Sequence, residues 1–434
     1  SAYLQQWMNQ QRELESPAAL AARPVVAGVE LLYRDLDTLR AIDLRNGRVA
    51  WEYTVEPGYD SAIPVSSLDE PELRARRYQF GELVAANGAI NNVSTDGRRV
   101  YLLDDTAGAL EALSRPTEIR DRTPAERRDA TRNQLIALRL GADLEGLPRL
   151  VWSTADGAGG AGGPLEGHVF LGPPLVTPGW LYSITEADRE LSLAALHPRT
   201  GEVRWVQPIA EADRSFFEDR ARGLRDCVPT LAGGLVLCPT HLGLLVAVDA
   251  VTGRLVWVHA QQNPAPDLRT PVFRTGATNS AQLRPAAFTP QAHVSAGRLY
   301  FLSGQATGLY RIDLLTGQTV WRIDARTADS VAHVSPDAAY VVYRDAVRAH
   351  AVDNGRELWQ VRLPSPVTGK GVAVGDNLFI PLAHSGLMRI RLSDGHFIQS
   401  PAIPGEAMTG HLVATSEGIA ALGSEGVASY RWTQ

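Results

Sequence analysis

The sequence predicts an all-β protein, a single β-propeller of about eight four-stranded blades, with seven blades as the alternative. Two observations predict it: one hairpin phrase recurs along the chain, and another hairpin precedes several of its copies. The composition agrees, because 39 Gly and 27 Pro in 434 residues suit many short turns, and 44% hydrophobic residues suffice for a large core. We expect the propeller at residues 24–434, after a helical segment or linker at residues 1–23.

The recurring phrase is an apolar strand ending in Asp or a substitute, a short turn closing on glycine, and a second strand with an aromatic residue four positions after that glycine. Full copies lie at 39–53, 193–207, 245–259, 309–323 and 347–361, and degenerate copies at 135–154 and 387–400. Such a turn needs a positive φ, which glycine adopts without steric cost. The glycines expected to close these turns are Gly47, Gly201, Gly253, Gly317 and Gly355.

An aromatic residue recurs at one place in the second strand of the phrase. A large ring repeated in register suits packing between neighbouring sheets. We therefore expect these tryptophans to be mostly buried at equivalent positions between blades. They are Trp51, Trp152, Trp205, Trp257, Trp321 and Trp359.

A second hairpin lies upstream of the phrase, for example at 24–33, 228–238 and 367–383. Two hairpins make one four-stranded blade. Blade starts near residues 24, 88, 168, 225, 285, 331, 369 and 408 give eight units. The eighth supplies only three strands before the sequence stops.

The pattern A-x-D-x-x-T-G-x-x-x-W resembles the PQQ-like repeat, which quinoprotein dehydrogenases and BamB-like proteins share. The resemblance extends from about residue 24 to the last residue. It implies a propeller of seven or eight blades. It says less about function, because the superfamily contains both cofactor enzymes and cofactor-free scaffolds.

Charge and hydropathy exclude some partners. The net charge is −6, and no basic surface is expected that could hold a nucleic acid. Lys370 is the only lysine among the 42 basic residues, which we interpret as genomic composition bias. No run of 18 apolar residues exists, so no membrane span is predicted. The sequence begins at Ser1, not Met, and shows no charged start followed by an apolar stretch, so we expect either a mature form or a part of a longer chain.

Residues for enzyme chemistry are missing from the expected places. The resemblance to quinoproteins would imply adjacent cysteines near the quinone, an Asp base, and Glu and Asn metal ligands, whereas the two cysteines here are Cys227 and Cys238. The ten histidines show no metal-binding spacing, although loops could bring His168 and His384 together. We therefore predict no cofactor and assign no catalytic, cofactor-binding or metal-binding residue.

Cys227 and Cys238 flank a predicted turn at Ala232–Gly234. If the turn is centred on Ala232 and Gly233, the two cysteines face each other across the hairpin, and we expect a disulfide. A turn centred one residue later would instead pair Cys227 with Thr240, and two buried free thiols are the alternative. A disulfide would favour a periplasmic or extracellular protein.

The leading hypothesis from the sequence is a non-catalytic propeller scaffold that binds a protein or peptide partner outside the cytoplasm. A first alternative is a quinone- or metal-dependent dehydrogenase of the quinoprotein type, which carboxylates gathered around a cavity would favour. A second is a carbohydrate-binding or cell-surface module, which exposed aromatic side chains would favour.

Overall fold

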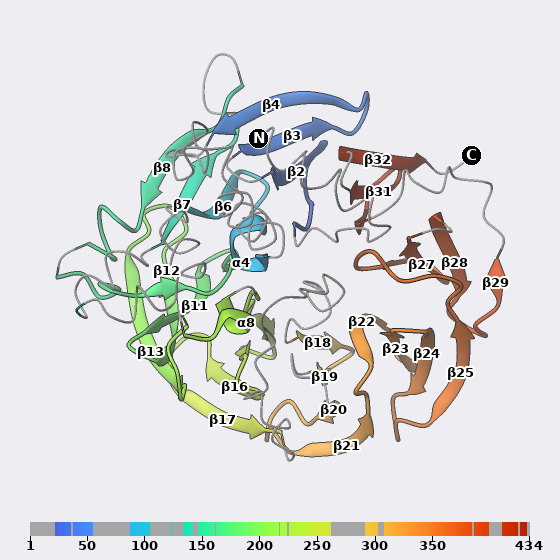
Figure 1. Ribbon diagram of the computed structural model, residues 1–434. Coiled ribbons are helices and arrows are strands. Elements are labelled where there is room, and N and C mark those ends of the chain that lie inside the picture. Colours follow the sequence, from blue (N-terminus) through green and yellow to red (C-terminus); the bar gives the residue numbers. More distant parts are fainter. Residues whose placement is uncertain are drawn as a thin grey trace, which may run out of the picture. The chain divides into compact units, whose positions relative to one another are not determined.

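The chain forms an eight-bladed β-propeller in the computed structural model, whose sheets are drawn in Figure 1. The described residues are 22–35, 38–54, 87–104, 123, 133–141, 146–160, 162–216, 218–223, 225–261, 291–302, 308–383, 386–398, 410–423 and 426–431. The helical segment expected at residues 1–23 lies outside them, apart from its last two residues.

The chain divides into two compact units, and the first contains Ala21–Pro229 with Thr252–Leu255. Its three sheets consist of β1 (Val25–Ala27), β2 (Glu30–Asp35), β3 (Thr38–Asp43) and β4 (Arg48–Thr54); β5 (Ser94–Thr95), β6 (Arg99–Asp104), β7 (Gln134–Arg139) and β8 (Arg149–Ser153); and β9 (Val169–Phe170), β10 (Leu175–Val176), β11 (Leu181–Ala187), β12 (Glu190–Leu196) and β13 (Val203–Glu211). Two short described helices, α4 (Gly88–Asn91) and α8 (Arg220–Gly223), belong to this unit.

The second unit contains Thr230–Val251 with Val256–Gln434. Its five sheets consist of β14 (Thr230–Ala232), β15 (Leu235–Pro239), β16 (Leu244–Asp249) and β17 (Leu255–Ala260); β18 (Gln291–Ser295), β19 (Arg298–Leu302), β20 (Gly308–Ile312) and β21 (Thr319–Asp324); β22 (Ala328–Val334), β23 (Ala338–Tyr343), β24 (Ala346–Ala351) and β25 (Glu357–Arg362); β26 (Val372–Val374), β27 (Asn377–Leu382), β28 (Gly386–Arg391) and β29 (Phe397–Ile398); and β30 (His411–Ala414), β31 (Gly418–Gly423) and β32 (Gly426–Arg431).

Seven sheets are meanders in sequence order, the third differs in that β9 also pairs with β11, and the predicted blade starts are confirmed. The eighth sheet has three described strands, as the sequence indicated. We call the first strand of each sheet its inner strand. Within the second unit the inner strands contact one another in order, β14 with β18, β18 with β22, β22 with β26 and β26 with β30. Inner strands of neighbouring sheets therefore lie side by side, while the last strand of each sheet lies at its outer edge (Figure 1).

The repeated turn shows why the phrase folds as a hairpin. After β20, the Asp313 carboxylate accepts hydrogen bonds from the N–H groups of Leu315 (3.1 Å) and Thr316 (2.8 Å). The hydrogen bond from the Thr316 hydroxyl (2.8 Å), together with these two, lowers the pKa of Asp313. Gly317 then closes the turn at a φ of 72°, where its N–H donates to the carbonyl of Asp313 (2.9 Å). The Asp and Gly of the phrase thus have separate tasks in one turn.

The core lies between neighbouring sheets. One cluster, for example, joins Tyr340 and Val342 of β23 to Leu378 and Ile380 of β27. The middle strands are apolar on both faces, because each sheet is covered by a neighbour on either side. All six residues of β23 are buried.

The third sheet departs from the repeat, because β9 and β10 both pair with β11. Its inner strand is interrupted where Pro173 and Pro174 follow Gly172. Proline has no N–H to donate to the ladder, so continuous pairing breaks there. This interruption makes room for the segment that precedes β14, as described below.

The predicted disulfide is wrong. Thr230 pairs with Leu237 and Ala232 with Leu235, so the turn is centred on Gly233 and Gly234, one residue later than the disulfide required. That register, extended, puts Thr240 and not Cys238 opposite Cys227. The Cys227 N–H instead donates to the carbonyl of Leu171 (2.9 Å), and both cysteines are buried free thiols. The alternative of two buried thiols is therefore the one observed. The cysteines then give no support for a periplasmic or extracellular location.

Candidate functional site

The repeat tryptophans lie against the turn glycines of the following sheet. In the second unit, a Cβ atom added to Gly317 would come within 2.6 Å of the Trp257 ring. Gly355 has the same relation to Trp321 and Gly395 to Trp359, at 3.1 Å and 2.7 Å. The indole N–H of Trp257 donates to the carbonyl of Leu314 (3.0 Å), and the other two rings make equivalent bonds. Only glycine leaves enough space for this contact.

The first unit contains the same contact between Trp152 and Gly201, where an added Cβ would lie 2.6 Å from the ring. Trp205 has the same relation to Gly253, which groups with this unit. Trp51 differs, because its indole N–H donates to Glu30 of its own sheet at 3.2 Å. Gly47 closes its turn at a φ of 72° and has open space where a Cβ would be. Trp51, Trp152 and Trp257 are buried, and Trp205, Trp321 and Trp359 are half-buried.

A buried polar cluster, formed by Arg23, Asn92 and Asp226, joins three distant segments of the first unit. The Asp226 side chain is fully buried, and its oxygens accept hydrogen bonds from Arg23 Nη2 (3.2 Å) and Asn92 Nδ2 (3.1 Å). The Arg23 N–H in turn donates to Asn92 Oδ1 (2.8 Å). Every member therefore contacts the other two. A buried carboxylate held in this way is stabilised by charge-assisted hydrogen bonds.

Two glycines make room for Asp226. A Cβ on Gly88, the first residue of α4, would lie 2.9 Å from Asp226 Oδ1, and one on Gly172 would lie 3.2 Å from Asp226 Cβ. Asn87 caps α4 by accepting a hydrogen bond from the Ile90 N–H (3.1 Å), and its Nδ2 donates to the carbonyl of Gly223 (3.2 Å). The cluster therefore fixes α4 against the segment that contains α8.

A buried ion pair holds the α8 segment from its other side. Arg222 of α8 pairs with Glu186 of β11, and both side chains are almost fully buried. Glu186 also accepts a hydrogen bond from the Phe216 N–H (2.7 Å), and Arg222 donates to the carbonyl of Arg214 (2.7 Å). Burial raises the pKa of Glu186, although the Arg222 charge opposes this shift. The pair anchors a segment that the repeat pattern does not account for.

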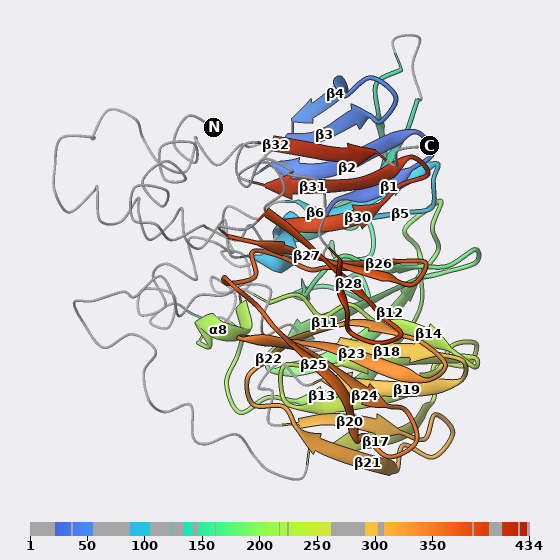
Figure 2. The same ribbon diagram turned by 90° about the vertical axis from the view of Figure 1, so that its right-hand side faces the viewer.

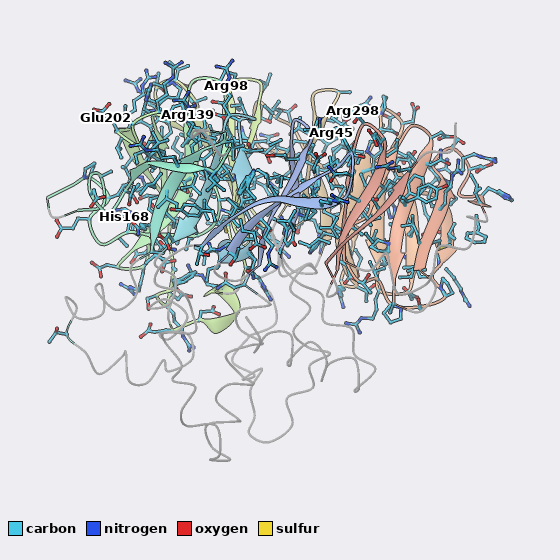
Figure 3. All side chains as sticks on the ribbon, turned by 90° about the horizontal axis from the view of Figure 1, so that it is seen from above. Arg45, Arg98, Arg139, His168, Glu202 and Arg298 are labelled. Carbon is cyan, nitrogen blue, oxygen red and sulfur yellow. The ribbon has the colours of Figure 1, made fainter. Side chains whose placement is uncertain are left out.

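These polar groups form hydrogen bonds and ion pairs with one another and with the backbone. Asp226 and Glu186 are the buried carboxylates of these contacts, and the sequence gives no signal for either, because their partners are remote in sequence. His168 lies beside Thr185, with 3.0 Å between Nδ1 and Oγ1, and burial lowers its pKa. His384, the partner considered for it, lies outside the described residues. Figure 3 shows His168 away from the edge that carries Arg45, Arg98 and Glu202.

In the described part of the chain, no three His, Cys, Asp or Glu side chains gather closely enough to hold a metal ion. Neither described helix has the length and apolar character needed to cross a bilayer. The helix α8 projects from the end of the first unit opposite its repeat turns (Figure 2).

The outer strand β17 exposes apolar side chains at the edge of its sheet. Val256 and Val258 are 46% and 47% exposed, whereas Trp257 and His259 of the same strand are buried. The strand pairs only with β16 among the described strands. An edge strand offers backbone N–H and C=O groups to an added strand, and exposed apolar residues strengthen such pairing. This edge, defined by Val256–Ala260 of the second unit, is a candidate docking site.

Comparisons with known proteins agree with the repeat. No curated protein matches the sequence. Among solved structures, BamB of Moraxella catarrhalis is 15% identical with a TM-score of 0.55, over 94% of this chain and 92% of that one. Quinohemoprotein alcohol dehydrogenase of Comamonas testosteroni is 14% identical with a TM-score of 0.54, over 95% and 72%. Sqt1 of Saccharomyces cerevisiae is 9% identical with a TM-score of 0.54, over 96% of each chain. At these identities the likeness shows the fold alone.

The family comparison goes further than the structural ones. The family model described as outer membrane protein assembly factor BamB matches residues 149–400, more than half of the sequence. This range begins in the second sheet and extends through the seventh, so it includes five of the six repeat tryptophans. The chain therefore belongs to the family of the outer membrane protein assembly factor BamB.

Proposed function

We propose that this chain is a non-catalytic propeller scaffold that binds a protein or peptide partner outside the cytoplasm. The observation that carries the proposal is the family match, because the family is described as an assembly factor for outer membrane proteins. An assembly factor acts through contacts with other proteins. A periplasmic location rests on the same description, since the disulfide does not form.

The docking edge on β17 is where we place the partner. A partner segment in extended conformation would add to the edge of the strand, and Val256 and Val258 would contact its apolar side chains. Backbone hydrogen bonds would supply affinity, and the alternating side chains would supply specificity.

The rival function is that of a quinone-dependent dehydrogenase. The structural likeness to quinohemoprotein alcohol dehydrogenase favours it, although at 14% identity this likeness extends to the fold only. The two cysteines are eleven positions apart in sequence, whereas the quinoproteins would imply an adjacent pair. The proposed scaffold function therefore has stronger support than the dehydrogenase function.

A pull-down from native extract tests the proposal. We expect the wild-type chain to retain a partner in stoichiometric amount, and the Val256→Glu/Val258→Glu variant to lose it, because two buried charges oppose strand addition. The control is Val320→Glu on the outer strand β21, which is 49% exposed and should retain the partner.

A calorimetric titration distinguishes the scaffold from the quinone-dependent dehydrogenase. Pyrroloquinoline quinone with calcium should produce no saturable heat with a scaffold. Saturable binding together with dye-linked alcohol oxidation would support the dehydrogenase instead. A wild-type chain that retains no partner would also contradict the scaffold proposal.

A further inference from the structure

Three arginines face one another across the second sheet of the first unit. Arg99 of β6 pairs directly with Arg139 of β7, and Arg139 pairs directly with Arg149 of β8. Residues that are directly opposite in an antiparallel sheet lie on the same face, with Cβ atoms about 4.5–5.5 Å apart. The three side chains therefore form one row across neighbouring strands, which we call the arginine row.

The arginine row lies where its face of the sheet leaves the core. The next residues on this face, Tyr101 and Ala137, belong to the apolar cluster between the second and third sheets. Arg139 and Arg149 are exposed. Figure 3 shows Arg139 at the same edge of the first unit as Arg98. The row is therefore open to solvent at the end of the sheet where β7 connects to β8.

Only Arg99 has a carboxylate partner among the described residues. Its Nη1 lies 3.0 Å from Asp96 Oδ2. The Asp96 carboxylate also accepts hydrogen bonds from the Arg99 N–H (2.6 Å) and the Tyr101 hydroxyl (3.0 Å). Neither Arg139 nor Arg149 forms an ion pair with a described carboxylate, and residues 142–145 of the connection between them lie outside the described residues.

The turn between β12 and β13 borders the arginine row. Its Pro198 carbonyl accepts hydrogen bonds from the Tyr101 hydroxyl (3.2 Å) and from Trp152 Nε1 (3.1 Å). The same Tyr101 hydroxyl contacts the carboxylate that pairs with the row, so the turn lies close to it. Arg199 and Glu202 of this turn carry opposite charges. The turn therefore adds no net charge to the row.

The charges of the arginine row oppose folding when no anion is bound. Like charges directly opposite each other in a sheet are destabilising. Because the Arg99–Asp96 pair is neutral as a whole, Arg139 and Arg149 leave the row with about two positive charges, and guanidinium groups do not lose their protons near neutral pH. A binding function is a common reason for such a cost in stability to persist.

We propose that Arg139 and Arg149, with Arg99 beside them, bind the phosphate group of an anionic ligand. A guanidinium donates two parallel hydrogen bonds to phosphate oxygens. A phosphate monoester carries about −1.5 to −2 charges near neutral pH, which matches the two unpaired arginines, whereas a single carboxylate would leave one uncompensated. In an extended acidic peptide, alternate carboxylates are about 6.6 Å apart, which does not match the strand spacing of about 4.8 Å.

The phosphate group belongs either to a soluble phosphate ester or to a lipid headgroup. The arginine row belongs to the first unit and the docking edge on β17 to the second. Failure of either proposal therefore leaves the other standing.

Calorimetry with inorganic phosphate at constant ionic strength tests the site on the full chain. We expect saturable binding by the wild type and none by Arg139→Met/Arg149→Met. Each single variant should bind about tenfold or more weakly, because one charge-assisted pair of hydrogen bonds is lost. The matched control is Arg189→Met in the connection between β11 and β12, at the opposite end of the third sheet. Arg189 pairs with Glu211 and is exposed, and its loss should leave phosphate binding unchanged.

Urea denaturation provides a second readout and shows that the variants fold. Without phosphate, Arg139→Met should be at least as stable as the wild type, because a contact between like charges is removed. Phosphate should raise the denaturation midpoint of the wild type and leave that of the double variant unchanged, because a ligand stabilises only the state that binds it. Equal increases in both proteins would overturn the proposal.

Vesicle sedimentation identifies the source of the phosphate group. Vesicles that contain phosphatidic acid in phosphatidylcholine should bind the wild type, and not the double variant, if the source is a lipid headgroup. Phosphate binding without vesicle binding assigns a soluble ester. The proposal is overturned if neither phosphate nor these vesicles distinguish the wild type from the double variant, or if polyglutamate alone binds through the arginine row.

Discussion

The two units hold their sheets together by different means. In the second unit one apolar contact recurs, in which a tryptophan of one sheet packs on a turn glycine of the next. The first unit uses this contact too, but adds buried charges: the cluster around Asp226, the Glu186–Arg222 pair, and Arg34, which donates to the carbonyls of Ile90 and Leu103. The repeated tryptophan–glycine contact therefore holds neighbouring sheets together where the blades follow one another regularly. The irregular segments are held instead by specific polar partners.

This difference has an energetic meaning. Tryptophan packing stabilises the fold through the burial of apolar area, and this contribution changes little when a side chain moves slightly. A buried ion pair stabilises the fold only when its geometry is good and its remaining hydrogen-bonding groups are satisfied. We therefore expect the first unit to be the more sensitive to single polar substitutions.

The buried ion pair should give the largest effect. Arg222→Met leaves the Glu186 carboxylate buried without its partner and should lower the free energy of unfolding by about 3–5 kcal/mol. Urea denaturation measures this loss, and hydrogen exchange should locate it in the first unit. The double variant Glu186→Gln/Arg222→Met removes both charges and should recover part of the loss. A single variant as stable as wild type would show that the pair does not anchor α8.

A tryptophan of the second unit should follow closely. Trp257→Ala removes a buried ring, and the expected cost is about 3–5 kcal/mol if the neighbouring sheets do not close over the cavity. Trp257→Phe keeps an aromatic ring and loses the bond to the Leu314 carbonyl, so about 1 kcal/mol is expected from that bond. Thermal and urea unfolding measure both. Equal stability of the alanine variant and wild type would contradict a packing role.

The turn glycines allow the packing contribution to be isolated. Gly317 and Gly297 have φ values of 72° and 73°, but only Gly317 has a ring within reach of an added Cβ. Gly297→Ala should therefore cost about 1–2 kcal/mol, from backbone strain alone. Gly317→Ala should cost about 1–3 kcal/mol more, from overlap with Trp257. If both variants lost the same free energy of unfolding, the Trp257 ring would have moved away from the added Cβ at no cost in stability.

Acid should weaken the second unit gradually, which is the smallest of these effects at neutral pH. Burial lowers the pKa of His259, His293, His333 and His350, all in this unit. A histidine whose folded pKa is depressed contributes stability above its unfolded pKa near 6.5, and that stability is lost as the pH falls toward the folded value, about 3 for His293.

Hydrogen exchange as a function of pH measures this slope. Protection in the second unit should fall between about pH 6.5 and pH 3, and His293→Gln should make the fall shallower. An unchanged slope in that variant would show that His293 does not take up a proton on unfolding in this range.

The features that repeat could be predicted from the amino-acid sequence. The Asp and Gly of the turn act within a few residues of each other, and the tryptophan falls at one place in each strand, so their pattern is visible without knowledge of distant contacts. Eight blades, their starting points and the three strands of the last one followed from this periodicity.

The contacts that do not repeat could not be predicted from the sequence, because they depend on the tertiary structure. Asp226 meets Arg23 and Asn92 across separations of 203 and 134 residues, and no local pattern encodes such a meeting. The turn between β14 and β15 could be centred on either of two residue pairs, and the one that forms separates Cys227 from Cys238. Local periodicity sets where strands and turns lie, whereas partners remote in sequence are chosen only when whole sheets pack against each other.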